Sequence, residues 1–232
     1  MNLRHQNGFT LWELLITLLV AGILIGIGVP NVMEFQRNGA MTAAANQLLT
    51  GLIVARTEAV KRQAPVGWCL SANPTAATPT CAPNQVANST TLGFVVWVDE
   101  NGNTNADGSP KLDDATDGNG AIDANELVLM REAPIGPPMR VSANCGFVLF
   151  GTNGFTRRER AQALCFPNPH TVLFCDDRGR RVAAGSLSSA RAVRVDAPGR
   201  AVVLTAAGLN AITTTVNNAI TVDLAGVNPT CP

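Results

Sequence analysis

The chain has 232 residues, of which 46% are hydrophobic and 15% are charged, and its 17 basic residues balance its 17 acidic residues. The protein as a whole is therefore neither strongly basic nor strongly acidic, although the two signs are unevenly distributed. About 170 residues follow Pro65, which is ample for a single hydrophobic core.

An apolar run from Phe9 to Val29 follows a short polar segment that carries Arg4 and His5. A helix of that length, rising about 1.5 Å per residue, reaches about 30 Å, which is the thickness of the hydrocarbon core of a bilayer. The run therefore predicts a helix that crosses a membrane once.

Glu13 is the single charged residue in this run. A carboxylate inside a membrane-spanning helix costs about 2.5 to 3.5 kcal/mol on insertion scales. Because the run contains no Lys, Arg or His, we expect the partner to come from another chain or from a new amino terminus. Cleavage after Gly8 would create an amine on Phe9, and a charged pair could then form between neighbouring subunits.

Three other interpretations compete. A secretory signal peptide would end in a small-x-small cleavage site, and no such site clearly ends this run. A plain membrane anchor explains the length but not Glu13. A buried helix of a soluble protein would also have to tolerate an uncompensated carboxylate.

The segment from Gly8 to Leu15 resembles the class III signal of type IV pilins and type II secretion pseudopilins. This resemblance implies a prepilin peptidase that cuts after Gly8 and methylates the new terminal nitrogen of Phe9. It also implies an assembly role for Phe9, Glu13 and the helix-bending Pro30.

The next segment, Asn31 to Gln63, carries apolar residues in steps of three and four that draw one stripe along a helix. Ala64-Pro65 is expected to end this helix. We expect a bend or local melting near Gly26, Gly28 and Pro30, where proline removes a backbone hydrogen bond. The stripe consists of Met41, Ala45, Leu48, Leu52, Ala55 and Ala59.

Beyond Pro65, short β-branched and aromatic runs alternate with Gly, Pro, Asn and Asp clusters, as in antiparallel strands. The predicted fold class is α+β and pilin-like, with one long N-terminal helix packed on an antiparallel β-rich domain. We divide the chain into a leader (1–8), a transmembrane half-helix (9–29), an amphipathic half-helix (30–63) and a β-rich domain (64–232). The predicted strands are Gly93 to Val98, Glu126 to Met130, Gly146 to Phe150, Thr171 to Phe174, Ala190 to Val195, Arg200 to Thr205 and Ala219 to Leu224.

Three segments narrow the resemblance: 55–62 of the helix, 94–101, and 190–195 with the following Gly199-Arg200. Together they are similar to the H-type pseudopilins and the FimT/FimU minor pilins. This resemblance implies a low-abundance filament subunit.

The six cysteines favour an oxidising compartment. They lie on the opposite side of the apolar run from Arg4, so the positive-inside rule places them in the periplasm. We expect pairs Cys69–Cys81, Cys165–Cys175 and Cys145–Cys231, although the sequence cannot choose among the pairings. A zinc site is the rival interpretation, but no CxxC spacing supports it.

An acidic segment from Asp99 to Glu132 holds nine acidic and two basic residues. Part of it reads like the end of an EF-hand loop, so Ca²⁺ is a candidate ligand, although no cofactor is required. The alternative is a solvated turn rich in Asp, Asn and Gly, and residues 103–119 look like an insertion. The candidate ligands are Asp99, Asn101, Asn103, Asp117, Asn119, Asp123 and Glu126.

Arginines in the second half of the chain suggest contact with phosphate, and FimT-like pilins include DNA receptors. The candidates for DNA binding are Arg178, Arg180 and Arg181. However, no basic residue follows Arg200, which counts against DNA, and arginines often only solvate strand edges.

The sequence shows no phosphate loop, dinucleotide fingerprint or recognisable nucleophile motif, so we do not expect an enzyme. We predict a minor pilin that is anchored in the inner membrane with its C-terminal domain in the periplasm, and that then enters a pilus. The expected partners are other pilin subunits and the prepilin peptidase. A type II secretion pseudopilin and a DNA receptor at the pilus tip are the alternatives.

Overall fold

The computed structural model describes residues 9–83, 85–99, 122, 126–157, 170–177 and 190–204. The chain divides into two compact units, Met1–Ala40 and Met41–Pro232, and each is considered separately below. The helix α1 (Leu11–Arg62) contributes to both units, and the second unit contains the strands.

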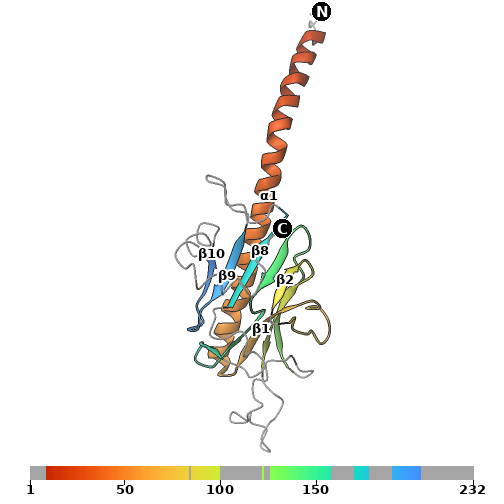
Figure 1. Ribbon diagram of the computed structural model, residues 1–232. Coiled ribbons are helices and arrows are strands. Elements are labelled where there is room, and N and C mark those ends of the chain that lie inside the picture. The colour runs from red at the N-terminus through yellow and green to blue at the C-terminus, as the bar shows by residue number, and fades with distance from the viewer. Residues whose placement is uncertain are drawn as a thin grey trace, which may run out of the picture. The chain divides into compact units, whose positions relative to one another are not determined.

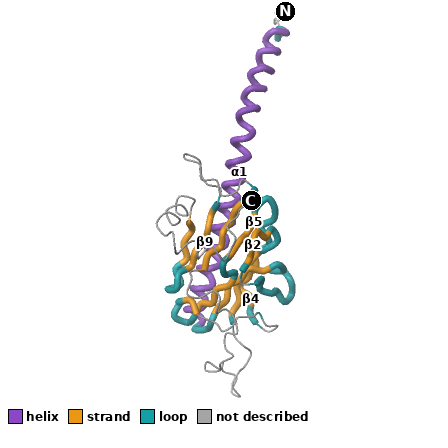
Figure 2. Tube along the Cα trace, in the orientation of Figure 1, coloured by secondary structure: helices purple, strands orange, loops and turns teal. Residues whose placement is uncertain are grey.

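The helix α1 is continuous from Leu11 to Arg62 (Figure 2). We predict a bend or local melting near Gly26, Gly28 and Pro30; the local melting is wrong, and the bend stays a prediction. A proline costs the helix one hydrogen bond and each glycine about 1 kcal/mol, whereas helix propagation on both sides is cooperative. The helical turns on either side therefore keep the segment helical.

The C-terminal end of α1 lies where the sequence places it, just before Ala64-Pro65. Gln63 adopts a left-handed backbone with a φ of 55°, and its Nε2 donates a hydrogen bond of 2.6 Å to the carbonyl of Val60. A left-handed residue at this position is a common way to stop a helix and to satisfy its last carbonyls. The chain can then turn directly into the first strand.

Within the described residues, ten strands form two five-stranded sheets, and every described pair is antiparallel. The first sheet has the order β4-β3-β1-β6-β7 and the second β10-β9-β8-β5-β2. In Figure 1, β8, β9 and β10 lie side by side, in agreement with their register. The strands are β1 (Val66–Ser71), β2 (Val86–Ser89), β3 (Gly93–Val98), β4 (Val128–Glu132), β5 (Arg140–Ala143), β6 (Phe147–Phe150), β7 (Thr156–Arg157), β8 (His170–Cys175), β9 (Arg191–Val195) and β10 (Ala201–Leu204).

The main core lies between the second half of α1 and the two sheets. All six residues of the predicted stripe are at most 2% exposed. They pack in one cluster with Trp68 and Phe94 of the first sheet and with Phe174 and Val193 of the second. The predicted buried face of this half-helix is therefore confirmed, and it covers both sheets.

A second, smaller core covers the other face of the first sheet. Trp97 and Phe147 are buried there, with their ring centroids 5.7 Å apart. A side chain on Gly67 of β1 would run into the Trp97 ring, so glycine is needed beside it. Ile122, which belongs to the acidic segment, also packs against this cluster. One part of the acidic segment is thus fixed to the domain by an apolar contact.

The predicted strand β3 has the observed bounds, and β6, β8, β9 and β10 lie within one residue of the predicted ones. The strand predicted from Glu126 begins at Val128 and continues to Glu132, whose Oε1 accepts a hydrogen bond of 3.1 Å from Gln47 Nε2 of α1. The sequence analysis missed β1, β2, β5 and β7. The predicted strand Ala219 to Leu224 lies outside the described residues.

Candidate assembly site

A reciprocal cap forms the N-terminal end of α1. Thr10 precedes the helix, and both its backbone N–H and its Oγ1 donate hydrogen bonds of 3.3 Å to Glu13 Oε2. The backbone N–H of Glu13 in turn donates a hydrogen bond of 3.3 Å to Thr10 Oγ1. This pattern, a Thr followed three residues later by a Glu, is a capping box.

The cap corrects one step of the sequence analysis. We had expected the partner of Glu13 to come from outside its own helix, because the apolar run contains no cation. The structure gives Glu13 a hydrogen-bonding partner in its own chain, Thr10, which directly precedes the helix, since the analysis counted charges and overlooked the Thr10 hydroxyl. Hydrogen bonds from Thr10 leave the carboxylate charge unneutralised, so a cation is still required to balance it.

Exposed apolar side chains dominate the described part of the first unit from Phe9 to Val29. Phe9 is 82% exposed and Leu11 is 76% exposed, and the exposed surface continues past Val29 to Phe35, which is 78% exposed. By length and composition, α1 is the one described helix that could cross a membrane. A helix that is apolar all round needs lipid or other helices to cover it.

The processing residues are only partly visible. Gly8 lies outside the described residues, whereas Phe9 is described and exposed at the start of α1. The helix backbone continues through Pro30, but the side chain of Pro30 is outside the described part. The roles of Gly8, Phe9 and Pro30 therefore stay predictions from the resemblance.

The first predicted disulfide is present. Cys69 and Cys81 are joined by an S–S bond of 2.08 Å, and their Cα atoms lie 5.6 Å apart. Cys145 and Cys175 are also disulfide-bonded. The partners that we predicted for them, Cys231 and Cys165, lie outside the described residues, so these two pairings stay predictions.

The structure describes two of the seven candidate calcium ligands, Asp99 and Glu126. Asp99 is fully buried at the end of β3, where its backbone N–H donates to the carbonyl of Pro65. Within the described ranges, no three His, Cys, Asp or Glu side chains gather around a common point. Calcium binding stays a prediction. The other five candidates, Asn101, Asn103, Asp117, Asn119 and Asp123, lie outside the described part.

The three arginines considered for DNA binding, Arg178, Arg180 and Arg181, all lie outside the described residues. Two described arginines of the second sheet form ion pairs at the surface. Arg194 Nε lies 2.9 Å from Asp196 Oδ1, and Arg140 Nη2 lies 3.5 Å from Asp177 Oδ1. These two side chains lie on inner strands of the sheet, and they do not test the three candidates, so DNA binding and the simpler interpretation both stay predictions.

Arg56 connects α1 to both sheets, a role that the sequence analysis missed. Its Nε donates a hydrogen bond of 3.1 Å to the carbonyl of Gly154, in the turn between β6 and β7. Its Nη2 donates one of 3.2 Å to the carbonyl of Pro198, in the turn between β9 and β10. The planar fork of an arginine suits two such acceptors. We call this set of contacts the Arg56 junction.

The same two turns also touch each other. Thr156 donates to the carbonyl of Ala197 from its backbone N–H, at 3.1 Å, and from its hydroxyl, at 3.0 Å. Gly154 and Gly199 have φ values of 75° and 74°, and a Cβ on Gly199 would meet the carbonyl of Gly154. In the sequence, this contact between the two turns is marked only by Gly154 and Gly199. A glycine indicates a turn but not which segment the turn contacts.

A fully exposed apolar helix with a capped glutamate at its start, joined to a β-rich domain with a disulfide, defines a pilin-like protein. Sequence comparison agrees with this class. The family model described as "Type II transport protein GspH" matches residues 44–230, and the model described as "Prokaryotic N-terminal methylation motif" matches residues 3–29. The chain belongs to the GspH family of minor pilins and pseudopilins.

Two crystal forms of the type IV minor pilin FimU from Pseudomonas aeruginosa resemble this chain, each with 15% sequence identity. The first covers 75% of this chain and 94% of FimU with a TM-score of 0.42, and the second covers 72% and 94% with a TM-score of 0.38. No curated protein sequence matches the chain.

Proposed function

We propose that this protein is a minor pilin, a structural rather than catalytic subunit of a type IV pilus. It is made as a membrane-anchored precursor, is cut after Gly8 by a prepilin peptidase, and assembles into or primes the filament through α1. The observation that carries this proposal is the exposed apolar surface from Phe9 to Phe35 with Glu13 as the one charge before Val29.

The driving force follows from the environment of Glu13. Helices in lipid gain little hydrophobic energy by associating, because lipid tails are as apolar as leucine side chains. A carboxylate that leaves lipid for a cationic partner gains much more, since an unpaired charge there costs about 2.5 to 3.5 kcal/mol. The amine created on Phe9 of a neighbouring subunit is such a partner.

The capping box makes this step selective for charge. Thr10 already supplies hydrogen-bond donors to Glu13 Oε2, so a neighbouring amine is not needed to satisfy that oxygen. What the amine adds is a positive charge. Filament entry should therefore depend on the negative charge of Glu13 more than on its hydrogen bonds, and the apolar side chains from Leu14 to Val29 then hold the packed helix.

The compartment follows from the disulfide and the leader. The Cys69–Cys81 bond supports an oxidising location for the second unit. Arg4 lies before the apolar run, and positively charged flanks stay on the cytoplasmic side. Together these features support an inner-membrane precursor with a periplasmic domain, which is later carried to the cell surface in the filament.

A second candidate, carried by the description of the family model that matches residues 44–230, is the pseudopilus of a type II secretion system. Deleting the gene separates the two. Loss of surface pili with normal protein secretion supports the pilus, and the converse result supports the secretion system. DNA binding is not proposed, because its candidate arginines lie outside the described residues.

The mature N-terminus tests the proposal directly. Protein purified from cells with an active prepilin peptidase should begin at Phe9 and carry one added methyl group on its terminal nitrogen, as measured by intact mass. A Gly8→Val variant should keep residues 1–8 and be missing from sheared filaments. Wild-type protein that retains its first eight residues would contradict the proposal.

A further inference from the structure

The strand β10 forms one edge of the second sheet, as Figure 1 shows. It pairs with β9 on one side, and no strand of the described ranges pairs with its other side. Alternate residues of β10 direct their backbone N–H and C=O groups towards this free side. Its residues, Ala201–Leu204, are all apolar. An apolar edge strand can pair with any extended segment, so proteins usually cover it.

A groove lies between α1 and the start of this edge strand, with a volume of about 680 Å³. Ile53, Thr57 and Val60 of α1 line one wall, in helical steps of four and three that place them on one face. Ile53 is 53% exposed and Val60 is 45% exposed. A strand added to the free side of β10 would direct alternate side chains towards this groove.

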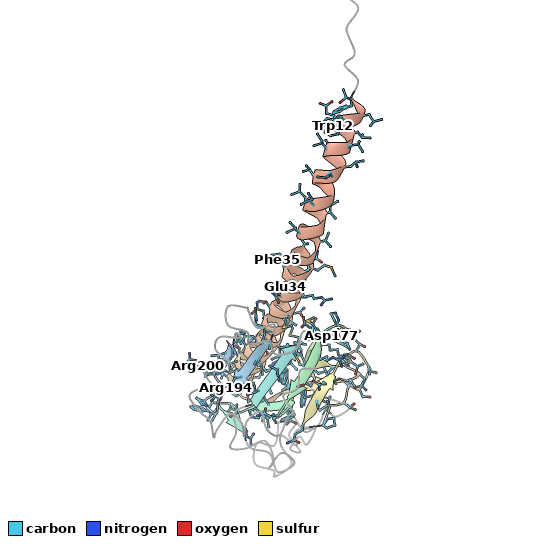
Figure 3. The ribbon with its side chains drawn as sticks, turned by 45° about the horizontal axis from the view of Figure 1, so that its top comes forward. Trp12, Glu34, Phe35, Asp177, Arg194 and Arg200 are labelled. Atoms are coloured by element: carbon cyan, nitrogen blue, oxygen red, sulfur yellow. A yellow bond between two sulfur atoms is a disulfide. The ribbon has the colours of Figure 1, made fainter. Side chains whose placement is uncertain are left out.

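The rim of the groove is cationic. Lys61 and Arg200 both line it, and none of the described lining residues is acidic. Lys61 is partly balanced by Glu58, whose Oε1 lies 3.2 Å away. Arg200, which is labelled at the edge of the domain in Figure 3, makes no ion pair within the described part of the chain. An occupant that suits both the edge and the groove is an extended apolar segment with a carboxylate near one end.

The C-terminal segment 205–232, which lies outside the described residues, contains a run with this chemistry. The segment has no basic residue, and Asp223 is its one acidic residue. Asp223 belongs to the run 219–224, in which polar and apolar residues alternate. Such alternation is typical of a strand with one buried face. The apolar positions of the alternation are Ile220, Val222 and Leu224.

We propose that residues 219–224 pair with the free side of β10 in the same chain, as an antiparallel strand. Because the groove lies at the start of β10, an antiparallel strand brings Asp223 to Arg200. A parallel strand would place Asp223 beside Leu204, away from the cationic rim. The intervening residues 205–218 are more than the two that the tightest antiparallel connection needs.

The apolar pattern agrees with one register of this strand. With Asp223 opposite Arg200, Val222 lies opposite Ala201. Ala201 packs against the main core, on the side of the sheet that faces α1, so Val222 would point into the groove beside Ile53. A shift by one residue would turn Val222 to the other face of the sheet. This contact forms within one chain, so it goes beyond the proposed pilin function and does not depend on it.

Photo-crosslinking of the full-length protein in detergent micelles tests the contact. A photoreactive benzoylphenylalanine replaces Ile53, and the matched control carries it at Gln85, which is exposed and does not line the groove. Unlabelled and isotope-labelled proteins are mixed, so the masses of linked peptides show whether both come from one chain. We expect the Ile53 probe, and not the Gln85 probe, to link to residues 219–224 of its own chain. A link between two chains, or no link to residues 219–224, would overturn the proposal.

Amide hydrogen exchange of β10 separates this run from the other β-branched run, Ile212 to Val216. Successive residues of a strand direct their N–H groups to opposite sides, so one of Thr221→Pro and Val222→Pro removes a hydrogen bond to β10. We expect that variant to raise exchange at the free side of β10 about tenfold and to leave β8 unchanged. The matched control Thr214→Pro should exchange like the wild type. Unchanged exchange in both test variants, or faster exchange in the control alone, would contradict the pairing.

Charge reversal tests the register. Arg200→Glu should lower the yield of the Ile53 crosslink about two- to fivefold, because a cross-strand pair of opposite charges contributes modestly. Arg200→Lys should keep the yield, and Asp223→Arg in the Arg200→Glu background should restore it. An Arg200→Glu variant with the full yield would contradict the proposed register, and so would a double variant that stays low while Arg200→Lys is normal.

Discussion

Glu13 Oε2 accepts two hydrogen bonds of 3.3 Å from Thr10, and Thr10 Oγ1 accepts one of 3.3 Å from the backbone N–H of Glu13. The two residues therefore share one structural task, which is to begin α1. Capping and charge are separate properties of the same side chain, and substitutions can separate them.

Replacing Thr10 with Ala removes the capping hydroxyl and keeps the Glu13 charge. We expect the first turn of α1 to fray, at a cost of about 1 kcal/mol, while membrane insertion and filament entry stay close to the wild type. Amide hydrogen exchange of the first turn, measured in detergent micelles, reports the fraying. Slower exchange than in the wild type would contradict the observed cap.

The Arg56 junction makes a prediction about stability. Arg56→Lys keeps the charge but loses the planar fork, so one of the two turns should lose its hydrogen bond. We expect the free energy of unfolding to fall by about 1 to 2 kcal/mol, because a hydrogen bond from a charged group contributes about that much. Urea unfolding of the full chain in micelles measures it, with the exposed Thr75→Ala as a control that should change little.

Substitution of Gly199 by alanine is predicted to destabilise the domain far more than the same substitution at Gly136, another glycine with a positive φ. Both Gly199 and Gly136 are left-handed, with φ values of 74° and 56°. A Cβ on Gly199 would meet the carbonyl of Gly154, whereas a Cβ on Gly136 would have no atom within 4 Å. Alanine at either position adds backbone strain of about 1 kcal/mol, and Gly199→Ala adds a steric clash. Equal melting temperatures of the two variants would contradict the closure of the turns.

His170 should make the domain sensitive to acid. It is 7% exposed on β8, and its Nδ1 has no hydrogen-bond partner in the described part of the chain. Burial lowers the pKa of His170 from 6.5 to about 4, although a hydrogen bond with the backbone of Phe147 opposes part of this shift. The unfolded chain therefore binds a proton at a higher pH than the folded chain does.

The direction in which stability changes with pH follows from this difference in proton binding between the unfolded and the folded chain. The stabilisation by neutral His170 is complete above pH 6.5 and declines as the pH falls from 6.5 towards 4, by up to about 3 kcal/mol. A His170→Gln variant should lose this part of the pH dependence. Unfolding free energies at pH 7 and pH 4.5 for both proteins measure it, since the carboxylates titrate alike in each. An identical pH dependence in the two proteins would contradict the assignment.

The sequence predicted the parts of the fold that have a clear pattern of apolar residues. The stripe from Met41 to Ala59 follows the helical period, and β3 is a continuous apolar run, so both were visible. The missed strand β1 contains Gly67. Glycine usually indicates a turn, but here it leaves space for the ring of Trp97. The missed strands β2 and β5 are short and partly polar, and they exist because their neighbours pair with them.

The candidate site divides in the same way. The membrane segment, Glu13 and the Cys69–Cys81 pair follow from residue type and spacing. The sequence contains the pattern of the Thr10 cap, a Thr followed three residues later by a Glu. The sequence analysis considered only charged partners for Glu13 and therefore missed it. The Arg56 junction depends on turns that are 98 and 142 residues away in the sequence. A local sequence pattern cannot predict contacts over such a separation.

The account depends most on the charge of Glu13, and Glu13→Gln tests it because glutamine can still accept the capping hydrogen bonds of Thr10. The measurement is the ratio of this variant to the wild type in sheared filaments, normalised to the amount inserted in the membrane, with Thr10→Ala beside it. The account predicts about tenfold less Glu13→Gln in filaments and a near wild-type ratio for Thr10→Ala. Equal incorporation of Glu13→Gln and the wild type would contradict it.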